Sequence, residues 1–469
     1  MKKILFILLI SPFFLISQSS YNLSLLGTYD WNNTEGNDIW GWADQNGNEY
    51  ALVGLNNGFS VVNVSNPNSP NEEFFIADLN STWRDVKTFG HYAYVTTEAN
   101  AGLLIVDLSD MTGNTFYHQT LFSNSNGSST EFTAAHNIYI DENGVAYIFG
   151  ASSNSGGSPT DGAIFLDVAT NPIDPIYLGE WNDYYIHDGM ARGDTMYVGC
   201  IYEGEMYIVD VSNKSNPQNL GHTATPSNFT HNAWVSNNGK YVFTTDEQSD
   251  AYVGAYDISN VNNIQEVDRV QSNPGSNSIP HNAHVDGNFL ITSWYRDGTV
   301  VHDITYPNNM IEVANYDSYA GSGDGFDGCW GTYPFLPSGN IISSDKNSNN
   351  SNNARLLVYS RDFQQASYID GNVSNLNNSN PITNANVEIL NTLTQINSST
   401  NISGYYNSGI ASTGNYDIVF SAPGYLSDTT NINLSSGIIT TVDMQLQPLV
   451  AFNTSGLVID NNGIGIDNS

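Results

Sequence analysis

A short motif that ends in Asp or Asn just before an apolar segment recurs seven times in this sequence. The polar residues of the motif are Asp38, Asp85, Asn137, Asp188, Asn232, Asn282 and Asp327. Their successive separations are 47, 52, 51, 44, 50 and 45 residues. A repeat of about 40–50 residues built from short strands is typical of a β-propeller, in which each repeat forms one blade. The spacing therefore predicts an all-β, seven-bladed propeller with these polar residues in a structural ring around its axis.

Each repeat also carries a regular order of strands. A turn rich in Gly and Asn follows the motif, and two apolar segments come next, the second ending in Asp as in YIVD at 207–210. We expect the propeller to occupy residues 23–365. Residues 23–30 (LSLLGTYD) resemble the fourth strand of other repeats, whereas the seventh repeat shows only three strands. We therefore predict that residues 23–30 supply the outer strand of the last blade and close the ring.

The two ends of the chain differ in composition from the propeller. Residues 1–17 begin with two lysines and continue as an apolar run, which predicts a signal peptide and a secreted or cell-surface protein. No later segment predicts insertion into a membrane. Beyond about residue 366, Lys and Arg disappear and the motif stops, and short strands over 367–447 predict a small β-sandwich. Residues 452–469 resemble its opening, so we expect them to start a second, truncated sandwich.

The charge of the chain narrows its partners. The 469 residues include 12 Lys plus Arg against 47 Asp plus Glu, a formal charge of −35. Nucleic-acid binding requires a basic surface, so this acidic protein is not expected to bind nucleic acid. The acidity suits solubility and attracts divalent cations. We expect a monomer, with Cys200 and Cys329 as buried apolar residues rather than a disulfide, because they lie in different repeats.

Histidine precedes the Asp or Asn of the motif in four consecutive repeats. Neutral imidazoles and carboxylates that converge on one axis are the ligands that zinc requires. The candidate metal ligands are His136, His187, His231, His281, His284, Asp188 and Asp246. A Gly- and Asp-rich stretch at 321–329 offers oxygen ligands to Ca²⁺, or is simply a loop. Zn or Ca is thus a possible cofactor, and the alternative is that the His and Asx side chains only hold the blades together by hydrogen bonds.

A second set of polar and aromatic residues is expected at the same end of the propeller. The second strand of each blade runs antiparallel to the first, so it ends where the motif begins. The candidate ligand-binding residues are Arg84, Asp85, Glu98, Glu247, Trp294, Tyr295, Arg296 and Trp330. A cleft lined by such groups suits a polar ligand, such as a sugar or a peptide, and can also host acid–base chemistry.

The candidate metal ligands and the candidate ligand-binding residues are compatible with three alternative functions. The first is a binding or adhesion module for a polar ligand or partner, such as a cell-surface glycan or protein. The second is a metal-dependent hydrolase or lyase that uses the His-lined face, and the third is a structural surface spacer. The sequence contains no nucleophile elbow, phosphate loop or zinc-protease helix motif, so we assign no catalytic residue and favour binding over catalysis.

Two segments resemble known families. The third-strand segments LLIVDLSDM (103–111), YIVDVSNKSNP (207–217) and VVNVSNPNSP (61–70) resemble the LVIVD repeat. With the flanking motifs of 37–109 they resemble the choice-of-anchor B family of exported bacterial proteins over residues 23–365. That resemblance implies a surface location, and this layout is similar to type IX secretion substrates. The stretch PITNANVEIL with GYYNSGIASTGNYDIVFSAPGYLS resembles the carboxypeptidase regulatory-like module, whose fold is similar to carbohydrate-binding sandwiches.

Overall fold

The computed structural model describes residues 20–152, 161–347, 351–392, 396–449 and 461–462. The chain divides into two compact units between Gln365 and Ala366. Strands dominate both units, and the described ranges contain a single helix, the 3-10 turn η1 (Tyr295–Asp297). The fold is therefore all-β, as the repeat predicts. No helix in these ranges has the length and hydropathy needed to cross a membrane.

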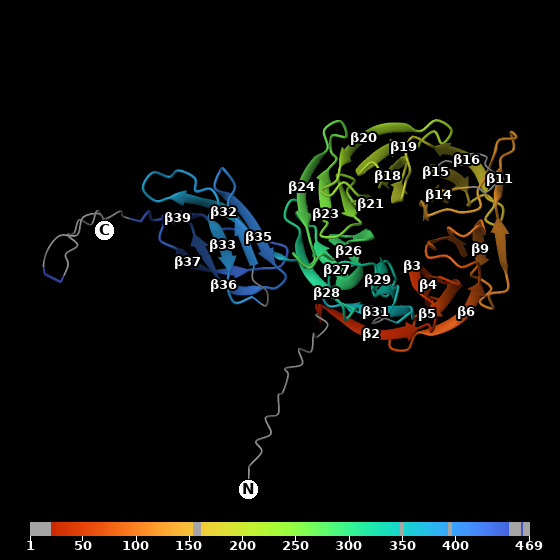
Figure 1. The fold of residues 1–469 in the computed structure, drawn as a ribbon, viewed down its shortest axis with the longest axis horizontal. Helices are drawn as coiled ribbons and strands as arrows, with labels where there is room; N and C mark the ends of the chain where they lie inside the picture. Colours follow the sequence, from red (N-terminus) through yellow and green to blue (C-terminus); the bar gives the residue numbers. More distant parts are fainter. Residues whose placement is uncertain (1–19, 153–160, 348–350, 393–395, 450–460, 463–469) are drawn as a thin grey trace, which may run out of the picture. The chain divides into compact units, whose positions relative to one another are not determined.

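Seven antiparallel sheets surround one axis in the first unit (Figure 1). Within each repeat the innermost strand comes first in the sequence, and the next two strands follow outward from it. Blade 1 contains β3 (Gly36–Ala43), β4 (Glu49–Leu55), β5 (Gly58–Asn63) and β6 (Asn71–Ala77). Blade 2 contains β7 (Val86–Phe89), β8 (Tyr92–Val95), β9 (Leu103–Asp107) and β10 (Phe116–Gln119). Blade 3 contains β13 (Asn137–Ile140), β14 (Val145–Phe149), β15 (Ala163–Asp167) and β16 (Ile176–Trp181). The hairpin of β11 (Leu121–Ser123) and β12 (Ser129–Glu131) separates blades 2 and 3 in the sequence.

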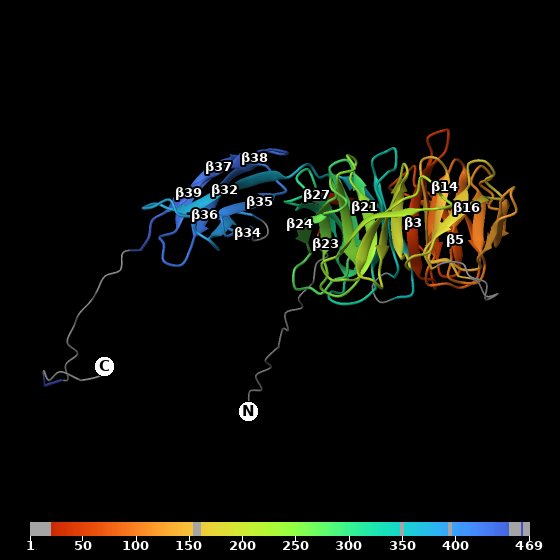
Figure 2. The same cartoon turned by 90° about the horizontal axis from the view of Figure 1, so that it is seen from above.

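The remaining blades repeat the same order. Blade 4 contains β17 (Asp188–Arg192), β18 (Thr195–Cys200), β19 (Glu205–Asp210) and β20 (Gln218–Ala224). Blade 5 contains β21 (Thr230–Val235), β22 (Tyr241–Asp246), β23 (Val253–Asp257) and β24 (Gln265–Val270). Blade 6 contains β25 (Ala283–Asp286), β26 (Phe289–Trp294), β27 (Gly298–Asp303) and β28 (Ile311–Tyr316). Blade 7 contains β29 (Cys329–Tyr333), β30 (Ile341–Asp345) and β31 (Arg355–Arg361). Seen from the side, the strands of this unit run between the two faces of a disc (Figure 2).

The N-terminal strand completes the last blade. Strand β2 (Leu23–Asp30) pairs antiparallel with β31, from Leu23 opposite Arg361 to Asp30 opposite Arg355. Just before it, β1 (Ser20–Tyr21) pairs with β28 of blade 6. The two ends of the propeller sequence therefore share one sheet, and β31 has a partner on its outer side.

The core lies between neighbouring blades. Both faces of each sheet are covered, so the second and third strands are apolar on both faces rather than alternating. All seven residues of β4 are buried, for example. The central channel is packed as well. In six blades the channel side chain lies two residues beyond the Asp or Asn of the motif, because residues i and i+2 of a strand point the same way. In blade 7 it is Tyr333, which lies six residues beyond Asp327. This channel layer consists of Trp40, Lys87, Tyr139, Met190, Trp234, His284 and Tyr333.

The second unit is a β-sandwich. One sheet has β32 (Ser367–Asn375) between β35 (Tyr405–Ile410) and β38 (Ile439–Thr441), and β39 (Met444–Leu446) also pairs with β32. The other orders β34 (Ile396–Ser399), β33 (Asn386–Ile389), β36 (Gly414–Ser421) and β37 (Asp428–Leu434). Apolar side chains of both sheets form one buried cluster. The predicted signal peptide (1–17) and nearly all of the predicted second sandwich (452–469) lie outside the described residues.

Candidate functional site

Four histidines from four consecutive blades form an arc at one end of the channel. The ring centroids are 3.9 Å apart between His136 and His187, 4.3 Å between His187 and His231, and 4.3 Å between His231 and His281. We call these four residues the His arc. They gather because all inner strands run in the same direction, so their first residues meet at one end. The arc borders a cavity of about 20 Å³, which is room for about one water molecule or ion.

Burial keeps the imidazoles of His187, His231 and His281 neutral. It lowers the pKa of His187 and of His231 well below the usual value, and that of His281 to about 4. The ring of His281 is also fixed in one tautomer, because its Nδ1 lies 2.5 Å from the carbonyl oxygen of Trp330 and must donate to it. The lone pair of His281 is therefore on Nε2, which points away from Trp330.

Two carboxylates reach the arc from the ends of second strands. Glu247, which follows β22, places Oε2 3.7 Å from Nε2 of His231 and Oε1 3.7 Å from Nε2 of His281. The hydroxyl of Tyr295 donates to Oε1 of Glu247 at 2.6 Å, and burial raises the pKa of Glu247 to about 7. In blade 2, Oε1 of Glu98 lies 2.6 Å from Nδ1 of His136. Side chains from both strand ends thus meet at the same face.

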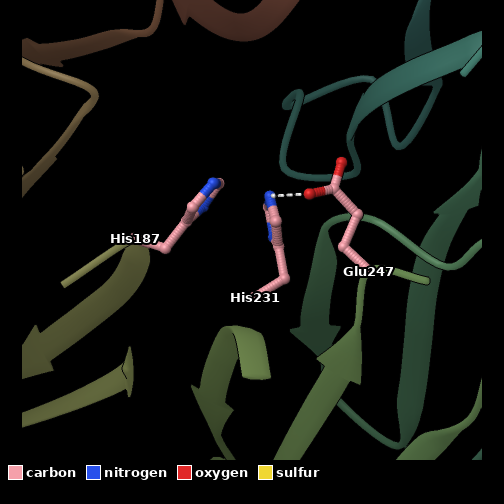
Figure 3. A group of neighbouring side chains, drawn as sticks. All are labelled: His187, His231 and Glu247. Atoms are coloured by element: carbon pink, nitrogen blue, oxygen red, sulfur yellow. Dashed lines mark ion pairs between the residues drawn. The ribbon is translucent and has the colours of Figure 1, made fainter. Parts of the chain in front are cut away.

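His187, His231 and Glu247 form the tightest group of possible metal ligands in the described part of the chain. One ligand atom from each lies within 4.8 Å of the other two. Figure 3 shows that their polar ends point toward the same region from separate strands. The sequence analysis placed Glu247 among the ligand-binding candidates and did not include it in the metal set.

Three of the candidate metal ligands lie away from this group. His284 is in the channel layer, with its ring 4.5 Å from that of Trp234, and burial lowers its pKa to about 3. Asp246 accepts hydrogen bonds from the hydroxyl of Thr225 and from backbone amides, so it holds a loop. Asp188 accepts from Nδ2 of Asn232 at 3.0 Å. Alternation along the strand explains these positions, because neighbouring residues point in opposite directions.

Several candidate ligand-binding residues are also engaged elsewhere. Arg84, at the start of blade 2, is 1% exposed and lines the cavity beside the His arc, as Asp85 does. Its guanidinium donates to Asp78 (2.6 Å) and to the backbone carbonyls of Leu55 and Leu79, so it braces blade 2 against blade 1 and the segment that follows it. Trp294 belongs to the apolar core between blades. Arg296 forms an ion pair with Asp327. The candidates that the structure places at the His arc are Glu98, Glu247, Tyr295 and Trp330.

Six of the seven residues of the predicted Asx ring lie at equivalent places at the starts of the inner strands, whereas Asp327 does not. In blade 5, Asn232 pairs with Thr245 after a bulge at His231. In blade 7 the corresponding bulge is at Trp330, so Gly331, 49 residues after Asn282, takes the ring position. Asp327 lies four residues earlier and accepts a hydrogen bond from Asn347 instead. A side chain has no room at Gly331, because an added Cβ would lie 2.6 Å from Oδ1 of Asp38.

A buried lysine, which the sequence analysis did not single out, neutralises this ring. Nζ of Lys87 lies 2.5 Å from Oδ1 of Asp85 and 3.2 Å from Oδ2 of Asp38, and sits 4.7 Å from the ring centroid of Trp40. Burial opposes the charge of Lys87, but the carboxylates of Asp85 and Asp38 raise its pKa overall. The period of two along β7 was the available signal, since Lys87 follows the ring residue Asp85 by two positions. Asp85 is therefore a structural residue in an ion pair.

A second buried carboxyl predicts how stability depends on pH. Asp345 accepts from the hydroxyl of Ser318 at 2.7 Å, and burial raises its pKa from 3.8 to about 7. A raised folded-state pKa means that the stabilising contribution is complete below about pH 4 and is lost as the pH rises through about 7. Asp345→Asn removes this loss. We expect its free energy of unfolding, relative to the parent, to increase between pH 5 and pH 8 in urea titrations.

Asp362→Asn is the control for this prediction, because Asp362 is exposed. The difference in free energy of unfolding between Asp362→Asn and the parent should stay constant between pH 5 and pH 8. A difference for Asp345→Asn that stays constant between pH 5 and pH 8 would contradict the assigned shift.

Comparison with known proteins identifies the repeats and the second unit. The LVIVD repeat matches residues 47–78, 82–117 and 190–225, and the carboxypeptidase regulatory-like domain matches residues 368–447. No curated protein sequence matches this chain.

Solved structures resemble the chain only distantly. They include the β-propeller domain of Cps50 (Swd1) from Myceliophteria thermophila, with 8% identity, 70% of this chain and 98% of that chain covered, and a TM-score of 0.47. A protein from Lactobacillus plantarum has 12% identity, 66% and 87% coverage and a TM-score of 0.47. A putative 6-phosphogluconolactonase from Bacteroides uniformis has 11% identity, 59% and 84% coverage and a TM-score of 0.44. The chain thus contains LVIVD repeats in a β-propeller, followed by a carboxypeptidase regulatory-like domain.

Proposed function

We propose that this protein is a binding module that captures a polar ligand at the His-arc end of its propeller. A propeller with LVIVD repeats suggests a protein-interaction or binding role. The observation that carries the proposal is an aromatic rim of three exposed side chains around the arc. They are Trp83 (42% exposed), Tyr202 (76%) and Phe326 (48%). Exposed aromatic residues around a polar centre are typical of binding surfaces.

Ring contacts connect each member of the rim to the arc. The ring of Trp83 lies 6.3 Å from that of His136. The ring of Tyr202 lies 4.8 Å from that of Tyr185 and is tilted against it by 40°, and the ring of Tyr185 is 6.1 Å from that of His187. On the opposite side, the ring of Phe326 lies 5.2 Å from that of Tyr295, and Tyr295 is 4.8 Å from His281. Blades 2 and 4 and the approach to blade 7 therefore present aromatic faces to one ligand.

The chemistry of this face favours a glycan or a peptide. Aromatic faces pack on sugar rings or on apolar side chains, and the carboxylates and imidazoles between them pair with hydroxyl or amide groups. The cavity at the arc, of about 20 Å³, admits a single small group, so most of such a ligand would rest on the rim. The formal charge of −35 disfavours nucleic acid and other polyanions.

We place this binding role outside the cell. The apolar N-terminal segment 1–17 supports export, and the likeness to the choice-of-anchor B family and the carboxypeptidase regulatory-like domain fits a secreted or surface-held monomer. Fusion of residues 1–30 to a reporter enzyme tests export directly. We expect the reporter outside the cytoplasm, and a reporter retained in the cytoplasm would contradict this location.

Substitutions in the rim test the binding role. Glycan and peptide arrays probed with the labelled chain should return a ligand. We expect the double variant Trp83→Ala and Tyr202→Ala to weaken binding of that ligand at least about tenfold in calorimetric titrations, because central aromatic residues dominate binding energy. The control is Phe116→Ala with Tyr117→Ala on the outer strand β10, where both aromatic side chains are also exposed, at 40% and 37%. No binding on either array, or equal losses in both double variants, would contradict the proposal.

A metal-dependent hydrolase or lyase is the second candidate, and the group of His187, His231 and Glu247 favours it. This function requires a bound metal and a substrate held over it. Hydrolysis of a labelled substrate panel should then depend on metal and stop with chelator. Binding without turnover would leave the first proposal in place, and neither binding nor turnover would favour a surface spacer.

A further inference from the structure

We propose that His187, His231 and Glu247 form a binding site for a transition-metal dication of the Zn²⁺ class, with His281 as the fourth ligand. The site lies at the open end of the propeller channel (Figure 3). This inference goes beyond the binding role, because it requires no partner on the aromatic rim. Nitrogen and carboxylate ligands in one group suit Zn²⁺, whereas Ca²⁺ takes oxygen ligands only.

The spacing of the group fits an ion better than direct contacts. Glu247 lies 3.7 Å from Nε2 of both His231 and His281, which is too long for a hydrogen bond. Zinc bonds of about 2.0–2.1 Å in a tetrahedral site separate the ligand atoms by roughly 3.4 Å. Small side-chain rotations would therefore bring the atoms, now within 4.8 Å of one another, around a common centre.

Two of the four proposed ligands, His281 and Glu247, also have the supporting contacts of a metal site. Metal-binding histidines usually donate the other ring N–H to a carbonyl or carboxylate, and ligating carboxylates are hydrogen-bonded in turn. Nδ1 of His281 donates to the carbonyl of Trp330, and the hydroxyl of Tyr295 donates to Glu247. These contacts leave Nε2 of His281 and Oε2 of Glu247 turned toward the group.

A purely structural role explains the arc less well. Histidines that hold blades together would form hydrogen bonds, yet Nδ1 of His187 and Nδ1 of His231 are buried without a hydrogen-bond partner in the described residues. Packing alone also does not require two imidazoles to face one carboxylate.

Metal titration of the full chain, purified through a tag without histidine and stripped with chelator, tests the site. We expect one Zn²⁺ per chain by elemental analysis after dialysis against Zn²⁺, and a rise in melting temperature that chelator reverses. Co²⁺ in place of Zn²⁺ should give visible absorption bands of a four- or five-coordinate site with nitrogen ligands. Substoichiometric Zn²⁺ with no shift in melting temperature would overturn the proposal.

Three variants locate the metal. His231→Ala and Glu247→Gln should each weaken Zn²⁺ binding at least about 100-fold, and Tyr295→Phe, which removes only a supporting hydrogen bond, about 10- to 100-fold. His222→Ala is the matched control, because His222 pairs with Glu205 at 2.8 Å on the outer strand of blade 4. It should bind Zn²⁺ as the parent does. Glutamine has nearly the same shape as glutamate, so Glu247→Gln should fold even if His231→Ala does not. Unchanged Zn²⁺ binding in Glu247→Gln would place the metal elsewhere and overturn the assignment.

Discussion

Lys87→Met is expected to lower the free energy of unfolding of the propeller by about 3–5 kcal/mol, because it leaves two buried carboxylates without their cation. Lys87 is 7% exposed, and its Nζ contacts Asp85 and Asp38 at 2.5 and 3.2 Å. With the ammonium present, the pKa of Asp38 lies below its usual value even though burial alone would raise it, whereas burial and the charge of Asp38 raise the pKa of Asp85 well above its usual value. Methionine has nearly the same length but offers no charge. Urea denaturation followed by tryptophan fluorescence measures the loss.

A compensated variant separates lost charge from lost packing. Adding Asp38→Asn and Asp85→Asn to Lys87→Met removes the whole ionic group, and replacement of a complete buried ion group is often neutral. We expect this triple variant to regain most of the lost stability. Lys240→Met, at an exposed position, is the control and should unfold like the parent. A single variant Lys87→Met as stable as the parent would show that the channel carboxyls do not depend on this lysine.

Removal of residues 20–30 is expected to cause the second large effect, loss of the stable monomeric propeller. This segment forms β1 and β2, and β2 makes seven residue pairs with β31. At about 1 kcal/mol for each hydrogen bond, the deletion costs roughly 5 kcal/mol before any loss of packing, which approaches the net stability of about 5–15 kcal/mol typical of proteins. It also exposes β31 as an edge that can pair with other chains. Size-exclusion chromatography and thermal melting compare chains that begin at Ser20 and at Trp31.

A peptide added in trans provides the control for the deletion. A synthetic peptide of residues 20–30 should pair with the open edge by strand addition and restore the melting temperature, whereas a scrambled peptide should not. A shortened chain that remains monomeric and melts with the parent would contradict the role of β2 in closing the ring.

Much of the fold could be predicted because it depends on periodicity. The separation of the motif identified the blades, and the two apolar segments of each repeat identified the buried strands. The strand at 23–30 could be assigned to blade 7 because its pattern matched outer strands elsewhere and one was missing there. The position of Glu98 and Glu247 beside the His arc followed from antiparallel pairing, since one strand ends where its neighbour begins.

The candidate site was harder to predict, because a shift of one residue along a strand reverses the direction in which a side chain points. Asp246 and Glu247 are adjacent, yet Asp246 holds a loop and Glu247 faces the arc. Arg84 precedes a ring residue as the histidines do, but its long side chain finds acceptors in the neighbouring blade 1 and the segment after it. The sequence around Asp327 matches the motif, but the bulge at Trp330 places Gly331 at the ring position in the structure. Bulges shift the register by one residue and leave no reliable signal in a single sequence.

The order of the residues alone determined the number of blades, their strands and the end of the channel at which the histidines start. These are properties of local pattern, because strand pairing and alternation act over a few residues at a time. The tertiary structure alone decided which side chains become neighbours: His187 and His231 beside Glu247, and Lys87 between Asp38 and Asp85. Such contacts join residues of different blades, and their distances depend on how the ring closes and on bulges that no repeat length reveals.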